Sequence, residues 1–234
     1  MTVSSIQNLV INLSGDDRKT CREAANHQIN NQLIIKDLGL TDYLTTLTAM
    51  QKFTQNRTGQ TSDELWFTQH TSVYTIGLNR KDTRLPDNNI SVIQSDRGGK
   101  ITYHGEGQVI IYLLIDLKRS NLAIRQLVKL MESSIIELLT THNIIGNVKK
   151  DAPGVFVKVD GVVKKIASLG LRIKNQCCYH GLSLNVNMDL KPFNAIDPCG
   201  YAGLMMTQTS DLGAQESPQK MGESLLKLLE KKLQ

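Results

Sequence analysis

Cysteine is scarce in this chain of 234 residues, which has four, at positions 21, 177, 178 and 199. Four cysteines at these spacings are too few for a disulfide scaffold, so a reducing compartment is expected. Long apolar runs are lacking as well, because the longest, residues 109–115, is far shorter than the ~20 residues that span a bilayer. The N-terminal residues do not resemble a targeting segment. These features predict a cytoplasmic protein that makes no membrane contact.

Clusters of one charge are also lacking. The chain has 27 Lys and Arg against 22 Asp and Glu, a formal net charge of +5, and the basic residues are scattered rather than gathered with aromatic side chains. That distribution does not favour a nucleic-acid partner. A mild positive field instead favours acidic protein partners.

What is present is an ordinary globular composition, with 40% apolar and 21% charged residues. Residues 1–32 are polar and weakly periodic, which indicates an N-terminal extension that carries no chemistry. Residues 33–234 contain no repeat and no Pro- or Ser-rich linker, so we expect one domain with one core.

The first half of this domain shows both helical and strand periodicity. Apolar residues at helical spacing predict a helix over residues 43–53, with Thr41 as its N-cap. Residues 65–69 and 73–76 have the composition of two short strands. A further strand is followed by a turn at Gly105 and Gly107, and then by an apolar strand that runs through Leu117. Both faces of this last strand are apolar, so we expect it in the centre of a sheet.

The second half predicts two more helices and a hairpin. Helical spacing over residues 121–140 follows a cap at Ser120 or Asn121, and Ser217-Pro218 opens a C-terminal helix. Asp160-Gly161 is typical of a two-residue hairpin turn between strands. The elements do not alternate as βαβ units, which predicts an α+β fold, a single domain with a mixed or antiparallel sheet flanked by helices.

Cys199 stands in the segment "IDPCGYAG", between Pro198 and Gly200. A free cysteine is most often a small buried hydrophobic residue. Here the proline restricts the backbone on one side, and the glycine allows a tight turn that brings its N–H close to a bound carbonyl group. The sequence leaves two interpretations open: a packed thiol, or a nucleophile on a rigid turn.

Lys164 and Lys165 follow the predicted hairpin turn, and strand alternation points their side chains to opposite faces. The companions of Lys165 on its face favour Lys165 as the inward residue. A lysine there is either a surface residue with a buried stem or a group for proton transfer. His104 precedes Gly105 where a strand ends, so it either borders a pocket or has a structural role.

The segment "QCCYHG" contains Cys177, Cys178 and His180, all of which are metal-ligand types. Adjacent cysteines on a strand point to opposite faces, and no second Cys or His pair has the spacing of a zinc site. We therefore expect no metal, and packed side chains at Cys177 and Cys178.

Five segments in order carry a resemblance to a known family: "DELWFTQH", "RGGKITYHGEGQ", "KKIASLGLRI", "HGLSLNV" and "IDPCGYAG". Together they resemble the bacterial octanoyltransferases of lipoate biosynthesis, also called lipoyl(octanoyl) transferases, from about residue 33 to about residue 229. The resemblance implies the fold of the biotin and lipoate protein ligases. It also implies transfer of an octanoyl group from acyl carrier protein to a lysine of a lipoyl domain.

The resemblance implies roles for individual residues. Cys199 matches the acyl-thioester cysteine, and Lys165 matches the lysine that lowers the pKa of that thiol. The substrate-contacting segments match Arg97, Gly98, Gly99, Lys100, Ile101, Thr102, Tyr103 and His104 in the first, Ser168, Leu169 and Gly170 in the second, and Gly181, Leu182 and Ser183 in the third.

The implied chemistry needs no cofactor, because the acyl group arrives on the phosphopantetheine of the carrier protein. The implied acceptors are the lipoyl domains of 2-oxoacid dehydrogenases and the H protein of glycine cleavage, and we expect a monomer. The chain departs from the family at Glu106, where a proline is usual, and at Thr71-Ser72, where two prolines are usual. Two alternatives remain open: an ATP-dependent ligase of the lipoate or biotin type, and a non-catalytic module that binds the carrier protein.

Overall fold

The computed structural model describes residues 33–81, 83–150, 152–198 and 203–234. The expectations for residues 1–32, and for the turn at residues 199–202, lie outside these ranges. Within them, the larger sheet contains β1 (Ile34–Thr41), β2 (Glu64–His70), β6 (Gln108–Asp116), β7 (Gly146–Lys149), β8 (Ala152–Val159), β9 (Val162–Lys174) and β10 (Cys177–Asn185).

The larger sheet has the strand order β1-β2-β6-β10-β9-β8-β7. β1 pairs with β2 in parallel, and the other neighbours pair antiparallel, so the sheet is mixed. β6 lies between β2 and β10, and eight of its nine residues are buried. The predicted α+β fold and the central place of this apolar strand are confirmed.

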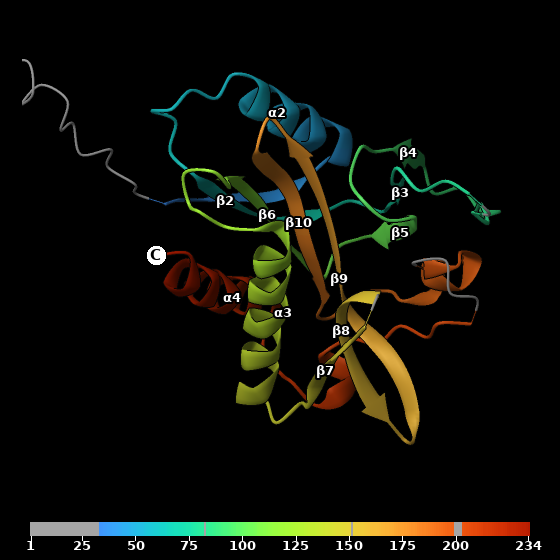
Figure 1. The fold of residues 1–234 in the computed structure, drawn as a ribbon. Helices are drawn as coiled ribbons and strands as arrows, with labels where there is room; N and C mark the ends of the chain where they lie inside the picture. The colour runs from blue at the N-terminus through green and yellow to red at the C-terminus, as the bar shows by residue number, and fades with distance from the viewer. Residues whose placement is uncertain (1–32, 82, 151, 199–202) are drawn as a thin grey trace, which may run out of the picture. The chain divides into compact units, whose positions relative to one another are not determined.

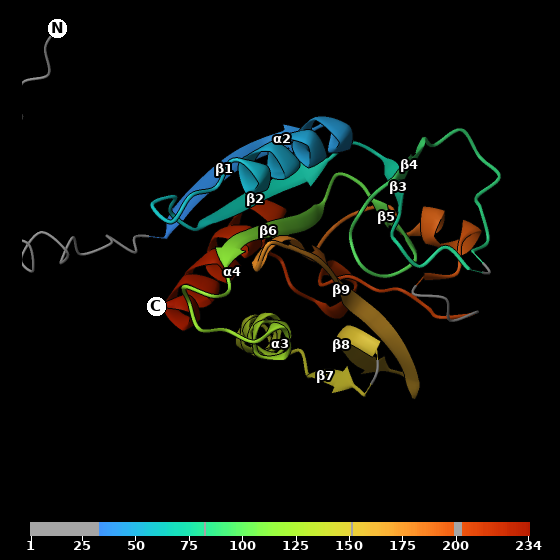
Figure 2. The ribbon, with the colours of Figure 1, turned by 45° about the horizontal axis from the view of Figure 1, so that its top comes forward.

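Helices cover both faces of the larger sheet (Figures 1 and 2). α3 (Ile124–Thr141) and α4 (Pro218–Leu233) pack on one face, where their apolar residues join those of β6 in the main core. α2 (Tyr43–Gln55) packs on the opposite face against β6 and β10, around Tyr43, Leu47 and Met50. Residues 110, 112 and 114 of β6 therefore face α2, while residues 109, 111 and 113 face α3 and α4.

A smaller sheet of β4 (Val92–Gln94), β3 (Val73–Ile76) and β5 (Ile101–His104) lies beside the larger one (Figure 2). The short 3-10 helix η1 (Lys191–Ala195) packs against it through Phe193, and a second, η3 (Ser210–Leu212), follows. β5 ends at His104, and it therefore places the end of the first predicted substrate-contacting segment, residues 97–104, next to α2.

Two predicted helix caps are wrong. Asp42, and not Thr41, caps α2, because its Oδ1 accepts the Thr45 backbone N–H at 2.8 Å. The next helix begins at Ile124 after Ala123, since Asn121 has a φ of 49° and lies in a turn. The cap at Ser217 is confirmed, since its Oγ accepts the Lys220 N–H.

No helix within the described ranges has the length and apolarity needed to cross a membrane.

Candidate active site

A pocket opens between α2, the larger sheet and the start of β5. About 530 Å³ of space free of protein atoms lies within it, part of this open to solvent. Its lining joins all three predicted segments, which are far apart in the sequence. The predicted residues that line it are Arg97, Gly99, Lys100, Ile101, Thr102, His104, Ser168, Leu169, Gly170, Gly181, Leu182 and Ser183.

Gly98 and Tyr103 are not part of the lining and instead support the walls of the pocket. The Gly98 N–H donates to the Leu171 carbonyl at 2.9 Å, which ties the 97–100 segment to β9. The Tyr103 hydroxyl is 2.9 Å from the Ser72 Oγ, and its ring packs edge-on against Phe193. These two residues position neighbouring residues that line the pocket.

Arg97 is buried and holds its own segment in place. Its guanidinium donates to the Thr75 carbonyl at 2.6 Å, to the Thr75 Oγ1 at 2.8 Å and to the Gly98 carbonyl at 2.9 Å. Gly181 lies on the opposite wall, where a Cβ atom would be only 2.0 Å from the Ile111 carbonyl oxygen. Glycine at this position is therefore required by the close approach of β6 and β10.

Tyr43, Ile110, Tyr112 and His180 also line the pocket, and the sequence did not indicate a site role for them. The Tyr43 ring stacks on His104, with centroids 5.8 Å apart and planes at 11°. The Tyr43 hydroxyl is 2.7 Å from the Ser95 Oγ. Tyr43 is thus both a core residue of an amphipathic helix and part of the pocket lining.

His70 and His104 are both buried. Burial lowers the pKa of His70 to about 4 and that of His104 to about 3. The His70 Nδ1 is 3.0 Å from the Thr41 carbonyl, which can only accept, so Nδ1 carries the proton. Its Nε2 then accepts from the Tyr112 hydroxyl at 2.6 Å. Both histidines are neutral at pH 7, because their folded pKa values lie well below it.

His180 has an unusual backbone for a strand residue, with a φ of 63°. This left-handed conformation breaks the alternation of β10, so the rings of Tyr179 and His180 stack together. The His180 Nε2 is 2.8 Å from the Asp96 Oδ1. Burial lowers the pKa of His180, and the Asp96 carboxylate partly offsets it. Partial burial acts to raise the pKa of Asp96, but hydrogen bonds from His180, Tyr179 and Gln51 outweigh it and hold that pKa below its usual range.

Lys165 points inward as predicted, with 1% of its surface exposed, while Lys164 is half-buried. Next to it the register of β8 and β9 shifts, so that Val155 pairs with Ala167 and Phe156 with Lys165. Ile166 is the extra residue of this bulge, and such bulges re-aim side chains. The Lys165 Nζ donates to the Pro153 carbonyl at 2.9 Å and lies 5.1 Å from the Phe156 ring centroid.

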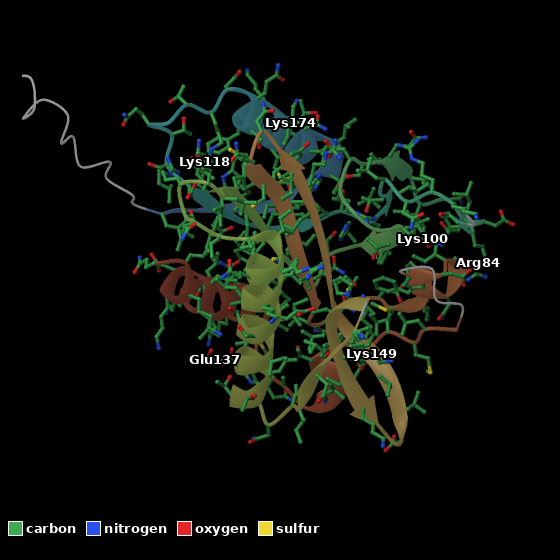
Figure 3. The ribbon with its side chains drawn as sticks, viewed as in Figure 1. Arg84, Lys100, Lys118, Glu137, Lys149 and Lys174 are labelled. Carbon is green, nitrogen blue, oxygen red and sulfur yellow. The ribbon has the colours of Figure 1, made fainter. Side chains whose placement is uncertain are left out.

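Cys199 lies outside the described residues, but the chain on either side of it is described. Before it, the Arg84 guanidinium donates to the carbonyls of Asn194 and Ile196 at 2.8 and 2.9 Å, and Figure 3 shows Arg84 beside this segment. After it, the Lys165 N–H donates to the Met205 carbonyl at 2.9 Å, and the Thr207 N–H donates to the Lys165 carbonyl at 3.0 Å. The chain that follows Cys199 is thus paired with the backbone of Lys165.

Cys177 and Cys178 are buried, and their predicted packing role is confirmed. Burial raises the pKa of the Cys178 thiol to about 12, and its Sγ donates to the Leu113 carbonyl at 3.3 Å. Across residues 33–234, outside the gaps named above, no three His, Cys, Asp or Glu side chains are grouped so as to hold a metal ion.

The family model of the lipoyl protein ligase A/B catalytic domain matches residues 42–229. Among solved structures, a bi-partite lipoate protein ligase from Thermoplasma acidophilum is similar with a TM-score of 0.69 and 15% identity, covering 86% of this chain and 84% of that one. A biotin protein ligase from Aquifex aeolicus has a TM-score of 0.51 and 14% identity, over 87% of this chain and 69% of that one. The fold is therefore that of a lipoyl protein ligase A/B catalytic domain.

Closer relatives narrow this class. An octanoyltransferase of Chromobacterium violaceum is 51% identical over 201 residues, which is 86% of this chain and 95% of that protein. One of Laribacter hongkongensis is 50% identical over 200 residues, 85% of this chain and 95% of the relative. The chain belongs to the octanoyltransferase family. The predicted resemblance and the prediction of an acyltransferase enzyme are confirmed.

Proposed function

We propose that this protein transfers an octanoyl group from octanoyl-acyl carrier protein to a lysine of a lipoyl domain, in lipoate biosynthesis, through a thioester on Cys199. The observation that carries the proposal is the pairing of Lys165 with Met205 and Thr207. That pairing holds residues 205–207, which follow Cys199 by six to eight positions, against the strand from which the buried Lys165 side chain projects.

In the first step the Cys199 thiolate attacks the octanoyl thioester. A thiol with an ordinary pKa of ~8.5 is only a few per cent ionised at pH 7, so a neighbouring cation or base is needed to prepare it. Lys165 has that role. The proton of the Cys199 thiol goes to Lys165, the new bond joins the Cys199 sulfur to the acyl carbon, and the bond to the carrier thiol breaks. The leaving thiolate takes the proton from Lys165, which leaves this lysine neutral for the second step.

In the second step the amine of the acceptor lysine attacks the Cys199 thioester. This amine is protonated at neutral pH and must lose a proton, which Lys165 accepts as general base. The C–S bond breaks, an amide forms, and Cys199 is released. Exchange between thioesters is close to isoenergetic, and the amide makes the overall transfer one-way without ATP.

The octanoyl chain occupies the pocket beside Ser168–Gly170. The lining of this pocket is mainly apolar and suits an alkyl chain, and its aliphatic residues are Ile101, Ile110, Leu169 and Leu182. The lining also includes a basic residue, Lys100, which Figure 3 shows next to β5. A net charge of +5 favours acidic carrier and lipoyl domains as partners. The cytoplasmic location, the monomeric state and the domain boundary at residues 32 and 33 stay predictions.

The experiment is to incubate the protein with octanoyl-acyl carrier protein and record its intact mass. We expect one octanoyl adduct that neutral hydroxylamine removes, and no such adduct on Cys199→Ser. Cys21→Ser is the matched control and keeps the adduct. An unmodified wild type would contradict the proposal, and an adduct that needs Mg-ATP and free octanoate would favour a ligase. An unreactive Cys199 in thiol titration would favour a binding module.

A further inference from the structure

A single peptide group lies between the buried Lys165 and a buried carboxylate. The Pro153 carbonyl accepts a hydrogen bond from the Lys165 Nζ at 2.9 Å. The N–H of the same peptide, which belongs to Gly154, donates to the Glu132 Oε1 at 3.0 Å. Glu132 and Lys165 are thus joined through the two ends of one amide.

Glu132 is an unusual residue for its position on α3. It is 9% exposed, and its neighbours on this helix include Met131 and Ile135, which are fully buried in the main core. A buried carboxylate is costly unless it is hydrogen-bonded. The Gly154 N–H supplies such a bond, so the contact accounts for a carboxylate at this position.

The conformation of Gly154 is adapted to this arrangement. Its φ is 132°, in the region that favours glycine. A Cβ atom on Gly154 would be 2.6 Å from the Lys165 Cε and 2.5 Å from the Ala167 carbonyl oxygen. The peptide is thereby packed tightly against the Lys165 side chain, with its N–H directed to α3.

We propose that Glu132 is a positioning residue for Lys165, which acts through the Pro153–Gly154 peptide. The Glu132 hydrogen bond fixes the orientation of the peptide, and so fixes the carbonyl oxygen to which the Lys165 Nζ donates. It also polarises the amide, which makes that carbonyl a stronger acceptor for an ammonium group. The inference rests on the proposed role of Lys165 in activating Cys199.

The test measures single-turnover octanoylation of Cys199 by intact mass in three variants. Glu132→Ala removes the acceptor, and we expect the maximal acylation rate to fall roughly 10- to 100-fold, because small displacements of a catalytic group cost that much. The carrier concentration for half-maximal rate stays nearly unchanged. Glu132→Gln keeps an acceptor oxygen and restores most of the rate. Ile135→Val loosens the same helix without touching the peptide, and acylates like the wild type.

A second readout is the pH dependence of Cys199 alkylation, followed on the Cys199 peptide. We expect its midpoint to rise in Glu132→Ala, because a displaced ammonium stabilises the thiolate less, and to return towards the wild-type value in Glu132→Gln. Urea unfolding of all variants separates this effect from lost stability. A wild-type rate and a wild-type midpoint in Glu132→Ala would overturn the proposal. A rate loss in Ile135→Val in proportion to its loss of stability would also overturn it, because loosening α3 alone would then slow acylation. If the wild type takes up no octanoyl group, it is the proposed function that fails.

Discussion

Gly154 and Lys165 show how closely single residues are fitted at this site. The lysine is fully buried, yet its ammonium group has a carbonyl acceptor and the face of the Phe156 ring. Lys149 lies 4.7 Å from the centroid of the same ring, so Phe156 contacts two cations. These contacts hold a long and otherwise flexible side chain in one place, which is what the proposed role of Lys165 in activating Cys199 requires.

Replacement of Lys165 tests its role directly. We expect Lys165→Ala to slow octanoylation of Cys199 by roughly 10²- to 10⁴-fold, the usual contribution of an acid–base group. The measurement is the time course of adduct formation by mass spectrometry. Lys164→Ala is the matched control, because Lys164 is the neighbouring lysine and is not buried. A full rate in Lys165→Ala would move the role to Lys164 or His104.

Replacement of Gly154 tests the close packing around Lys165. We expect Gly154→Ala to lower the free energy of unfolding by more than the ~1–3 kcal/mol of backbone strain alone, since its Cβ also collides with Lys165 and Ala167. Gly161→Ala is the control, because Gly161 has a φ of 80° but no atom within 4 Å of the place that a Cβ would occupy. The two values come from urea titrations. Equal losses in both variants would show that the collision is relieved by small shifts.

At the scale of elements, α2 both covers the sheet and carries Tyr43 to the pocket. Its first turn is held by Asp42, whose Oδ1 accepts from the Thr45 N–H and from the Thr45 hydroxyl. The Thr45 backbone hydrogen bond lowers the pKa of Asp42, so the cap is ionised at neutral pH. The orientation of Tyr43, the first residue of the helix, depends on this turn.

Removal of the α2 cap therefore has a defined cost. We expect Asp42→Ala to reduce the free energy of unfolding by about 1 kcal/mol, because an orphan N–H of the first turn loses its partner. Asp42→Asn retains an equivalent cap and should differ little from the wild type. Chemical denaturation measures both variants. A loss in Asp42→Asn as large as that in Asp42→Ala would contradict the capping role.

At the scale of the whole molecule, buried neutral histidines make stability depend on pH. His70 and His104 have folded pKa values of about 4 and about 3, against about 6.5 in an unfolded chain. Between these values the unfolded chain binds protons that the folded protein does not. Stability therefore rises with pH in this interval and is lost as the pH falls from 6.5 towards 4.

The expected size is about 1 kcal/mol per pH unit for each of the two histidines. Urea titrations at pH 7.5, 6 and 5 measure it. In His70→Gln the slope of stability against pH should fall by the share of one histidine, because glutamine does not titrate. An unchanged slope in that variant would show that His70 does not contribute to the acid sensitivity.

Most regular elements were predictable, and the reasons for the misses are physical. Long periodic segments such as α3 and β6 have patterns that report burial of one face or of both faces. β1, β4 and β7 were not predicted, since β1 and β7 lie at sheet edges with exposed residues, and β4 has only three residues. An exposed edge strand has little apolar pattern, and its pairing depends on a distant partner.

The sequence by itself determined the family, the order of the segments that form the pocket, and the inward direction of Lys165. It did so because motifs and periodicity are local properties of the chain. Only the tertiary structure decided that Tyr43 and His180 line the pocket, and that Glu132 and Lys165 share the Pro153–Gly154 peptide. Those contacts depend on how a helix packs on a sheet and on where a strand bulges, and no local pattern specifies either.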